Sequence, residues 1–227
     1  MTRPEVRALT LVVAVIACLL TACGGGGGSG AAKSSPAADK TASAKISLRQ
    51  SDFPSGWTSA PHQVTPEETA TLRQLTQCVG IPDLTGHTTA RDRSNDFSSG
   101  QATSASSNVV FATTDADASS DLAAFQSDKT PDCLKQAVLA LTKQQLSGTV
   151  PANLDARQLQ FPTLKDGTAA YQASFTVSVA GTSLPVYADF VYIRAGRAEV
   201  LLGTTNAGSP FDRKLEESLA RKMADRA

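Results

Sequence analysis

Two cysteines in the body of the chain, Cys78 and Cys133, are the side chains whose type and spacing suggest a chemistry most directly. Two thiols in one domain pair readily in an oxidising compartment. A redox-active pair is the alternative, but such pairs favour a Cys-x-x-Cys spacing, and these cysteines are much further apart. We therefore expect a Cys78–Cys133 disulfide that staples the fold.

Neither histidine has the sequence neighbours of a metal site or a catalytic centre. His62 and His87 lack a second ligand at a zinc-like spacing such as His-x-x-x-His. Serines are abundant, but no Gly-x-Ser-x-Gly or Ser-x-x-Lys motif places one beside an activating group. We expect both histidines on polar loops, with no metal, no cofactor and no catalytic residue, so the chain is not expected to be an enzyme.

Two groups of acidic residues have an ordinary helical explanation. Residues 115–121 (DADASSD) are spaced like the start of an EF-hand loop, but Ser120 and Gln126 stand where that loop needs Gly and Glu. The alternative, which we prefer, is that these acids oppose the dipole of a helix N-terminus. The neighbouring pairs Glu67/Glu68 and Glu216/Glu217 are expected on helix surfaces and not in a cleft.

The second half of the chain has the pattern of a β-sheet. Residues 171–179 alternate between apolar and polar, which predicts a half-buried strand. Residues 184–193 are apolar on both faces, which predicts a central strand. A turn at Ala180-Gly181 would connect these two strands into a hairpin. A second turn at Ala195-Gly196 would connect residues 184–193 to a third strand over residues 197–205 and place Thr204 opposite Tyr187.

This register gathers polar side chains on one face of the sheet. They are Gln172, Ser174, Tyr187, Asp189 and Thr204. We hypothesise that they line a ligand groove between the sheet and a helix. The alternative is a solvated sheet face.

Helix-start signals divide the rest of the domain. Helices are predicted after Thr65-Pro66, Thr114, Thr130-Pro131 and Ser209-Pro210. Residues 83–102 are polar and rich in Gly and Ser, which predicts a loop with at most one edge strand. The predicted fold class is α+β, an antiparallel sheet of about five to six strands with helices packed on it.

The N-terminus has the pattern of an export signal. A basic start precedes an apolar stretch over residues 8–20, which is too short to span roughly 30 Å of hydrocarbon as a helix. The stretch ends in Leu20-Thr21-Ala22-Cys23, which resembles a lipobox, the motif at which bacterial lipoproteins are acylated on cysteine and cleaved. We expect residues 1–22 to be a signal peptide and Cys23 to be the lipidated N-terminus. An ordinary signal peptide with an incidental cysteine is the alternative.

The chain then divides into a linker and one domain. Residues 23–44 are dominated by Gly, Ser and Ala and are expected to form a disordered linker. Residues 45–227 are long enough for a single globular domain. Lys and Arg together number 21, as do Asp and Glu, so no net charge points to nucleic acid.

Four short segments carry a family resemblance: residues 52–57 (DFPSGW), 131–134 (PDCL), 184–192 (LPVYADFVY) and 194–198 (RAGRA). Together with the lipobox they resemble actinobacterial cell-surface lipoproteins of the LpqN and PsbP-like kind. They are also similar to the extracellular sensor domains of PknH-type serine/threonine kinases, which typically hold two disulfides where this chain offers one. The resemblance implies a PsbP-like or PknH sensor-like fold, and a role in sensing or partner binding without catalytic residues.

The expected function follows from the predicted location at the membrane and from the family resemblance. We expect a lipoprotein held at the extracytoplasmic face of the cell membrane by its lipid, where it senses a small ligand or binds an envelope protein without catalysis. The alternative is a structural or accessory subunit that docks on another cell-envelope protein.

Overall fold

The computed structural model describes residues 35–81, 86–145, 151–179 and 181–227. The expected signal peptide and Cys23 lie outside these residues. The helices of the described part are α2 (Pro36–Ile46), α3 (Pro66–Val79), α4 (Asp115–Phe125), α5 (Thr130–Gln145) and α6 (Arg213–Arg226), with a 3₁₀ turn, η1 (Gln50–Asp52). The strands are β1 (Thr58–Ala60), β2 (Thr88–Arg93), β3 (Asp96–Ser99), β4 (Thr103–Ala112), β5 (Ala152–Gln158), β6 (Gly167–Val179), β7 (Thr182–Ala195) and β8 (Ala198–Ala207).

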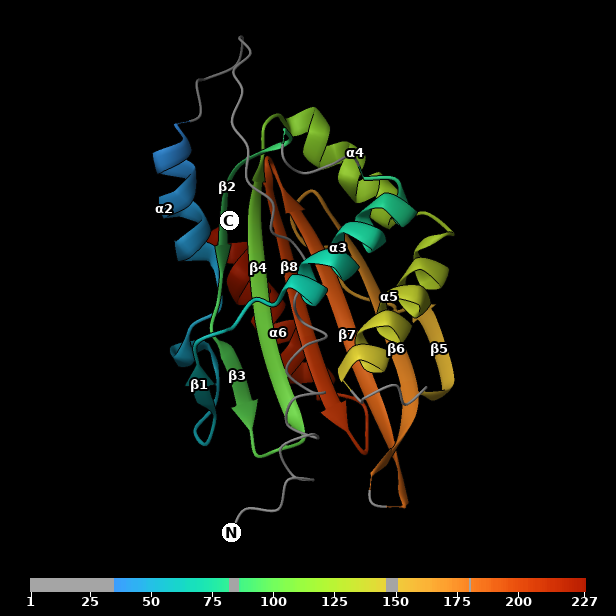
Figure 1. The fold of residues 1–227 in the computed structure, drawn as a ribbon. Helices are drawn as coiled ribbons and strands as arrows, with labels where there is room; N and C mark the ends of the chain where they lie inside the picture. The colour runs from blue at the N-terminus through green and yellow to red at the C-terminus, as the bar shows by residue number, and fades with distance from the viewer. Residues whose placement is uncertain (1–34, 82–85, 146–150, 180) are drawn as a thin grey trace.

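The strands form one open antiparallel sheet, as Figure 1 shows. Its order is β1-β3-β4-β8-β7-β6-β5, and β2 pairs with the upper part of β4. The long strand β7 lies between β6 and β8, so the prediction of a central strand over residues 184–193 is confirmed. The α+β class is confirmed too, but the sheet has eight strands and not five to six.

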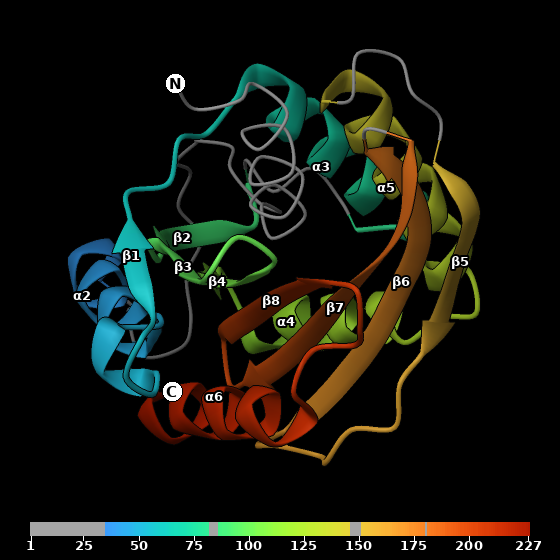
Figure 2. The same ribbon diagram turned by 90° about the horizontal axis from the view of Figure 1, so that it is seen from below.

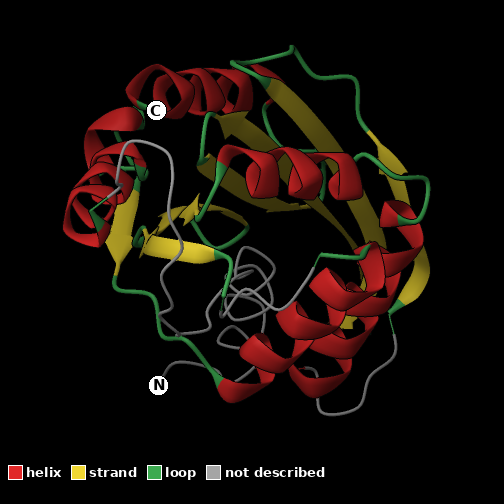
Figure 3. Cartoon of the chain, turned by 90° about the horizontal axis from the view of Figure 1, so that it is seen from above, coloured by secondary structure: helices red, strands yellow, loops and turns green. Residues whose placement is uncertain are grey.

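Helices cover both faces of the sheet and enclose two hydrophobic cores. Figures 2 and 3 show α6 on one face and α3, α4 and α5 on the other. Leu75, Leu134 and Phe175 are buried between the sheet and the α3–α5 side. Leu219 and Met223 of α6 are fully buried against the opposite face. The polar cluster described below lies on the α6 side.

The disulfide between Cys78 and Cys133 is present, with the two Cα atoms 5.7 Å apart. Cys78 lies in the last turn of α3, and Cys133 lies in the first turn of α5. The bond therefore joins two helix ends above the same face of the sheet, as expected from the sequence.

Two of the predicted helix starts are confirmed by their hydrogen bonds. Thr65 and Thr114 each accept a bond from the backbone N–H three residues on, and an acidic side chain returns a bond to the cap in both cases. The last helix begins later than predicted, because Asp212 and not Ser209 accepts the bonds from Lys214 and Leu215.

Two strands lie within residues 86–102, where a loop with at most one edge strand was expected, so that prediction was wrong by one strand. Residues 83–85 of the same segment lie outside the described residues. β2 pairs with β4 although its sequence, TTARDR, lacks an apolar side, and β3 (DFSS) contributes a single apolar residue, the buried Phe97. Helix α2 packs on β2, so its polar side chains are half-buried against another element. β2 is therefore a strand because it pairs with β4 and is covered by α2, and not because its sequence alternates between apolar and polar residues.

Helix α2 also corrects the expected linker, because it occupies residues 36–44 of it. The helix has little apolar surface of its own and is attached through Asp39, which is only 6% exposed. Arg197 donates to Asp39 at 2.7 Å, and the hydroxyl of Thr89 donates to the other carboxylate oxygen at 2.5 Å. The folded domain therefore begins before residue 45, and the rest of the expected linker lies outside the described residues.

No helix among the described residues is long and apolar enough to cross a bilayer.

Candidate functional site

The register of the β6–β7 hairpin is as predicted. Gln172 lies opposite Asp189, and Ser174 lies opposite Tyr187. The β7–β8 hairpin differs, because Thr204 lies opposite Asp189 and not opposite Tyr187. The reason is the turn: Ala195 pairs with Ala198, which leaves Gly196 and Arg197 in the loop, and Gly196 has a φ of 56°. A shift of two positions keeps each side chain on the same face.

Three of the five predicted site residues form a buried cluster beneath α6. Gln172, Asp189 and Thr204 are each no more than 5% exposed. The amide of Gln172 donates to Asp189 Oδ1 at 2.9 Å. The Thr204 hydroxyl donates to Glu216 Oε1 at 3.0 Å, and Glu216 itself has no exposed surface.

This arrangement is neither an open groove nor a solvated face. Glu216 of α6 occupies the space between helix and sheet that a ligand groove along these residues would need. Ser174 and Tyr187 lie on the same face, two residues further along each strand toward the β6–β7 turn, and both are half-buried.

Glu216 is the member of the cluster that sequence reasoning missed, since it was expected on the surface beside Glu217. The available signal was spacing. Position 216 lies three residues before Leu219 and seven before Met223, which is the buried stripe of an amphipathic helix. A charged side chain on such a stripe points to a buried polar partner on the facing element.

The two carboxyl groups of the cluster hold on to protons. Burial raises the pKa of Glu216 to about 7, and the carboxylate of Asp189 beside it acts in the same direction. Burial also raises the pKa of Asp189, against the opposing effect of its hydrogen bond from Gln172. Both shifts have the same physical cause, because burial and a like charge nearby disfavour the ionised form of each carboxyl group.

Two arginines connect the cluster to the surface. Arg213 donates to Glu216 Oε2 at 2.8 Å and to the backbone carbonyl of Gln160, and its guanidinium lies 4.5 Å from the centre of the Phe161 ring. Arg157 donates to Gln172 Oε1 at 3.0 Å. The buried pair is thus fixed to the segment that follows β5.

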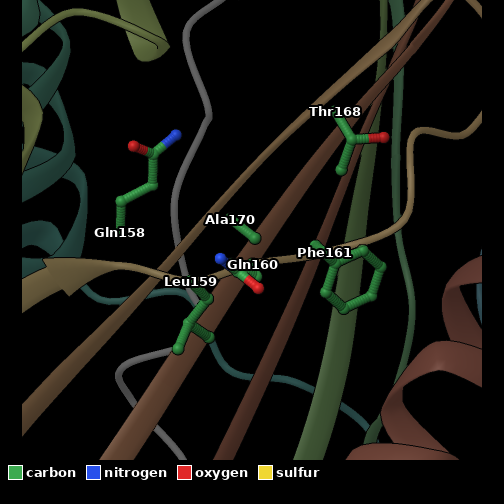
Figure 4. A pocket seen from close by; sticks show the side chains of 6 residues that line it. All are labelled: Gln158, Leu159, Gln160, Phe161, Thr168 and Ala170. Atoms are coloured by element: carbon green, nitrogen blue, oxygen red, sulfur yellow. The ribbon is translucent and has the colours of Figure 1, made fainter.

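That segment forms one wall of a pocket of about 530 Å³. The residues that line it are Gln158, Leu159, Gln160, Phe161, Thr168 and Ala170. Figure 4 shows Gln158 and Phe161 at opposite sides, with the other side chains between and above them. None of the six side chains is acidic, basic or a thiol, so the pocket offers hydrogen bonds and apolar contact but no fixed charge.

A second buried acid pair lies on the other face of the sheet, beneath α4. Burial raises the pKa of Glu199 on β8 well above its ordinary range, and Asp121 of α4 beside it raises it further. Both side chains are at most 5% exposed.

The other acidic residues of the segment 115–121, Asp115 and Asp117, make different contacts. Asp115 pairs with Arg194 at 2.7 Å, and Asp117 accepts from the backbone N–H of its cap, Thr114. Only the acids at 115 and 117 therefore lie in the first turn of α4, as the dipole explanation expects, while Asp121 faces the sheet.

His62 is not on a polar loop surface as expected, because its side chain is only 7% exposed. Its Nδ1 lies 2.9 Å from Asp96 Oδ2, and its Nε2 lies 3.3 Å from Glu68. Arg93 donates to the same Glu68 at 2.9 Å. Burial raises the pKa of Glu68 to about 7, with Arg93 opposing the shift.

The group of His62, Glu68, Arg93 and Asp96 connects the chain before α3 and α3 itself to strands β2 and β3. Both ring nitrogens of His62 lie at hydrogen-bond distance from a carboxylate, which fixes the ring between two elements. His87 lies 3.6 Å from Asp117. Within the described ranges, no three His, Cys, Asp or Glu side chains gather as metal ligands.

The fold and the cluster define an α+β domain, an open antiparallel sheet with a helix-covered polar cluster and a neutral pocket beside it. No family model matches the chain, and no curated protein matches it either. Among solved structures, the chain is similar to LpqN, which is involved in cell envelope biogenesis of Mycobacterium tuberculosis. The two share 12% sequence identity and a TM-score of 0.30, over 76% of this chain and 78% of LpqN.

Proposed function

We propose that this chain is a lipid-anchored, extracytoplasmic domain that binds a ligand and catalyses no reaction. The sequence supports the location at the membrane, because a short apolar leader ends in Leu20-Thr21-Ala22-Cys23, the pattern of a lipoprotein signal. The Cys78–Cys133 disulfide supports the same compartment, because structural disulfides persist on the oxidising side of the membrane.

The observation that carries the binding role is the pocket beside α6. Its volume of about 530 Å³ falls in the range of small-molecule sites, and its six lining side chains combine amides, a hydroxyl and apolar groups. A catalytic site needs an acid, a base or a nucleophile aimed at the reacting atom. The carboxyl groups of the neighbouring cluster, Asp189 and Glu216, are instead bonded to Gln172, Thr204 and Arg213.

The same residues suit a stable binding scaffold. The pocket floor is β-sheet, since Thr168 and Ala170 belong to β6. The backbone N–H of Leu159 donates to the carbonyl of Ala170 at 2.8 Å, which holds the wall to the floor. A site on such elements is formed before its ligand arrives, which reduces the entropic cost of binding.

Replacing Cys23 with Ser tests the address. We expect the variant to be released into the medium as a folded protein with its Cys78–Cys133 bond intact, because the thiol that would carry the lipid is gone. Cell fractionation with immunoblotting, and a gel shift on reduction, measure the two parts of this expectation. Cys18→Ser is the matched control, since Cys18 lies within the apolar leader and should leave with it. A Cys23→Ser protein that stays with the membrane contradicts the proposal.

A further inference from the structure

We propose that the pocket formed by residues 158–161 with Thr168 and Ala170 binds a neutral saccharide. This proposal rests on the proposed function and specifies the ligand class of the same site. It follows from three properties of the pocket: the kind of hydrogen bonds on offer, the apolar surface beside them and the local balance of charge.

The polar groups match hydroxyl groups. Gln158 and Gln160 each carry an amide that donates two hydrogen bonds and accepts at its oxygen, and the hydroxyl of Thr168 both donates and accepts. Sugar hydroxyls have the same double character, whereas a carboxylate or phosphate only accepts. The hydroxyl of Thr168 already accepts from the backbone N–H of Leu164 at 2.9 Å, which leaves its proton for a ligand.

The apolar groups match the carbon skeleton of a sugar ring. Phe161, Leu159 and Ala170 are the apolar residues of the lining, and Figure 4 shows the Phe161 ring at one side of the pocket with Leu159 and Ala170 near its middle. The C–H groups of a pyranose or furanose face carry partial positive charge and pack on the negative face of an aromatic ring. Arg213 also lies over this ring, but it is not among the residues that line the pocket.

The charge balance favours a neutral ligand over an anion. Arg213 is the cation that lies over the Phe161 ring, and its charge is met by Glu216 at 2.8 Å and Glu217 at 3.4 Å. Arg213 is therefore neutralised by two carboxylates of its own helix, α6. An acidic or phosphorylated ligand would find amides in the pocket where it needs a free cation.

The wall is held rigidly enough to select a shape. Arg213 lies over Phe161, donates to the carbonyl of Gln160 and is fixed in turn by the buried Glu216. These contacts set the aromatic ring of Phe161 and the backbone of Gln160 before a ligand binds. Glu216 is therefore a positioning residue for the pocket and does not reach it.

The test is a binding measurement on the lipidated full chain in detergent, with short neutral gluco-, galacto- and manno-oligosaccharides as probes. Saturation-transfer NMR and calorimetry with a series of concentrations give contact and Kd. We expect at least one neutral probe to bind, and Phe161→Ala to weaken it about tenfold, as loss of an aromatic anchor does. Gln160→Ala should weaken it about threefold or more. Gln74→Ala, an exposed glutamine on α3, is the matched control and should leave Kd unchanged.

Three outcomes overturn the proposal. Neutral probes that fail to bind remove the ligand class. An oligogalacturonate or an extended peptide that binds where the neutral probes do not replaces it with another class. Binding that Phe161→Ala and Gln160→Ala leave unchanged removes the site. Release of Cys23→Ser from the membrane is measured separately, so the proposed address can hold while the saccharide proposal fails. Circular dichroism of each variant shows that a lost signal is not a lost fold.

Discussion

Removing the Cys78–Cys133 disulfide is expected to lower the free energy of unfolding by about 4 kcal/mol. The bond joins residues 55 positions apart, and a cross-link of that length removes a large part of the entropy of the unfolded chain. For a domain of this size the loss corresponds to a fall in Tm of roughly 8–16 °C. Urea and thermal unfolding of a Cys78→Ala/Cys133→Ala double variant measure it.

Reduction of the unaltered chain supplies the matched comparison. Dithiothreitol should lower the Tm of the chain with both cysteines to that of the double variant and leave the double variant itself unchanged. If reduction and substitution both leave Tm where it was, the bond between α3 and α5 does not stabilise the fold. A loss far above the entropic value would show that α3 and α5 also depend on the bond for their packing.

The second large effect is a dependence of stability on pH that Glu216→Gln should reduce. Glu216 has an ordinary pKa of 4.5 and a pKa of about 7 in the folded protein. Between these values the folded chain keeps a proton that the unfolded chain has lost. The contribution of Glu216 to the free energy of unfolding is therefore fully present below pH 4.5 and is lost as the pH rises through 7. For this group the contribution is about 3 kcal/mol.

Other buried acids act in the same direction. The pKa values of Glu68, Asp121, Asp189 and Glu199 are raised, each mainly by burial. The unaltered protein should therefore melt at a higher temperature at pH 5 than at pH 8. Asp52, whose pKa is lowered by its bonds from Arg226 and Arg49 against the effect of burial, loses its contribution only at pH values below this window.

A glutamine at position 216 is neutral at every pH and retains an oxygen for the Thr204 hydroxyl. We expect the difference in Tm between pH 5 and pH 8 to shrink in Glu216→Gln, because one of the groups that lose their stabilisation is gone. Glu217→Gln, at the neighbouring half-buried position, is the matched control and should keep the full difference. A Glu216→Gln protein with the original pH dependence would mean that Glu216 does not hold a proton beneath α6.

Sequence reasoning predicted the parts of the fold in which local signals and tertiary contacts agree. The alternation over residues 171–179 predicted the burial of β6, and the turn expected at residues 180–181 predicted its register with β7. The capping residues Thr65 and Thr114 marked two helix starts, because their hydrogen bonds are local. The pairing of the two cysteines required only that the domain hold two thiols.

The parts that sequence reasoning missed depend on contacts between distant segments. Helix α2 is attached by an ion pair between Asp39 and Arg197, which no local pattern around residue 39 reveals. Strand β2 exists because β4 and α2 hold it. The polar set of the candidate site was placed on the correct face, but its burial depends on Glu216, a residue read from its charge and not from its position on the helix stripe.

The most direct test of the central claim, that the domain acts at the outer side of a membrane, is the mass of its N-terminus. The protein is extracted from membranes with detergent, digested, and its N-terminal peptide is sequenced by mass spectrometry. Our account predicts a peptide that begins at Cys23, with the cysteine increased in mass by a diacylglyceryl group on its sulfur. A peptide that begins at Met1, or one that begins at an unmodified Cys23, would contradict it.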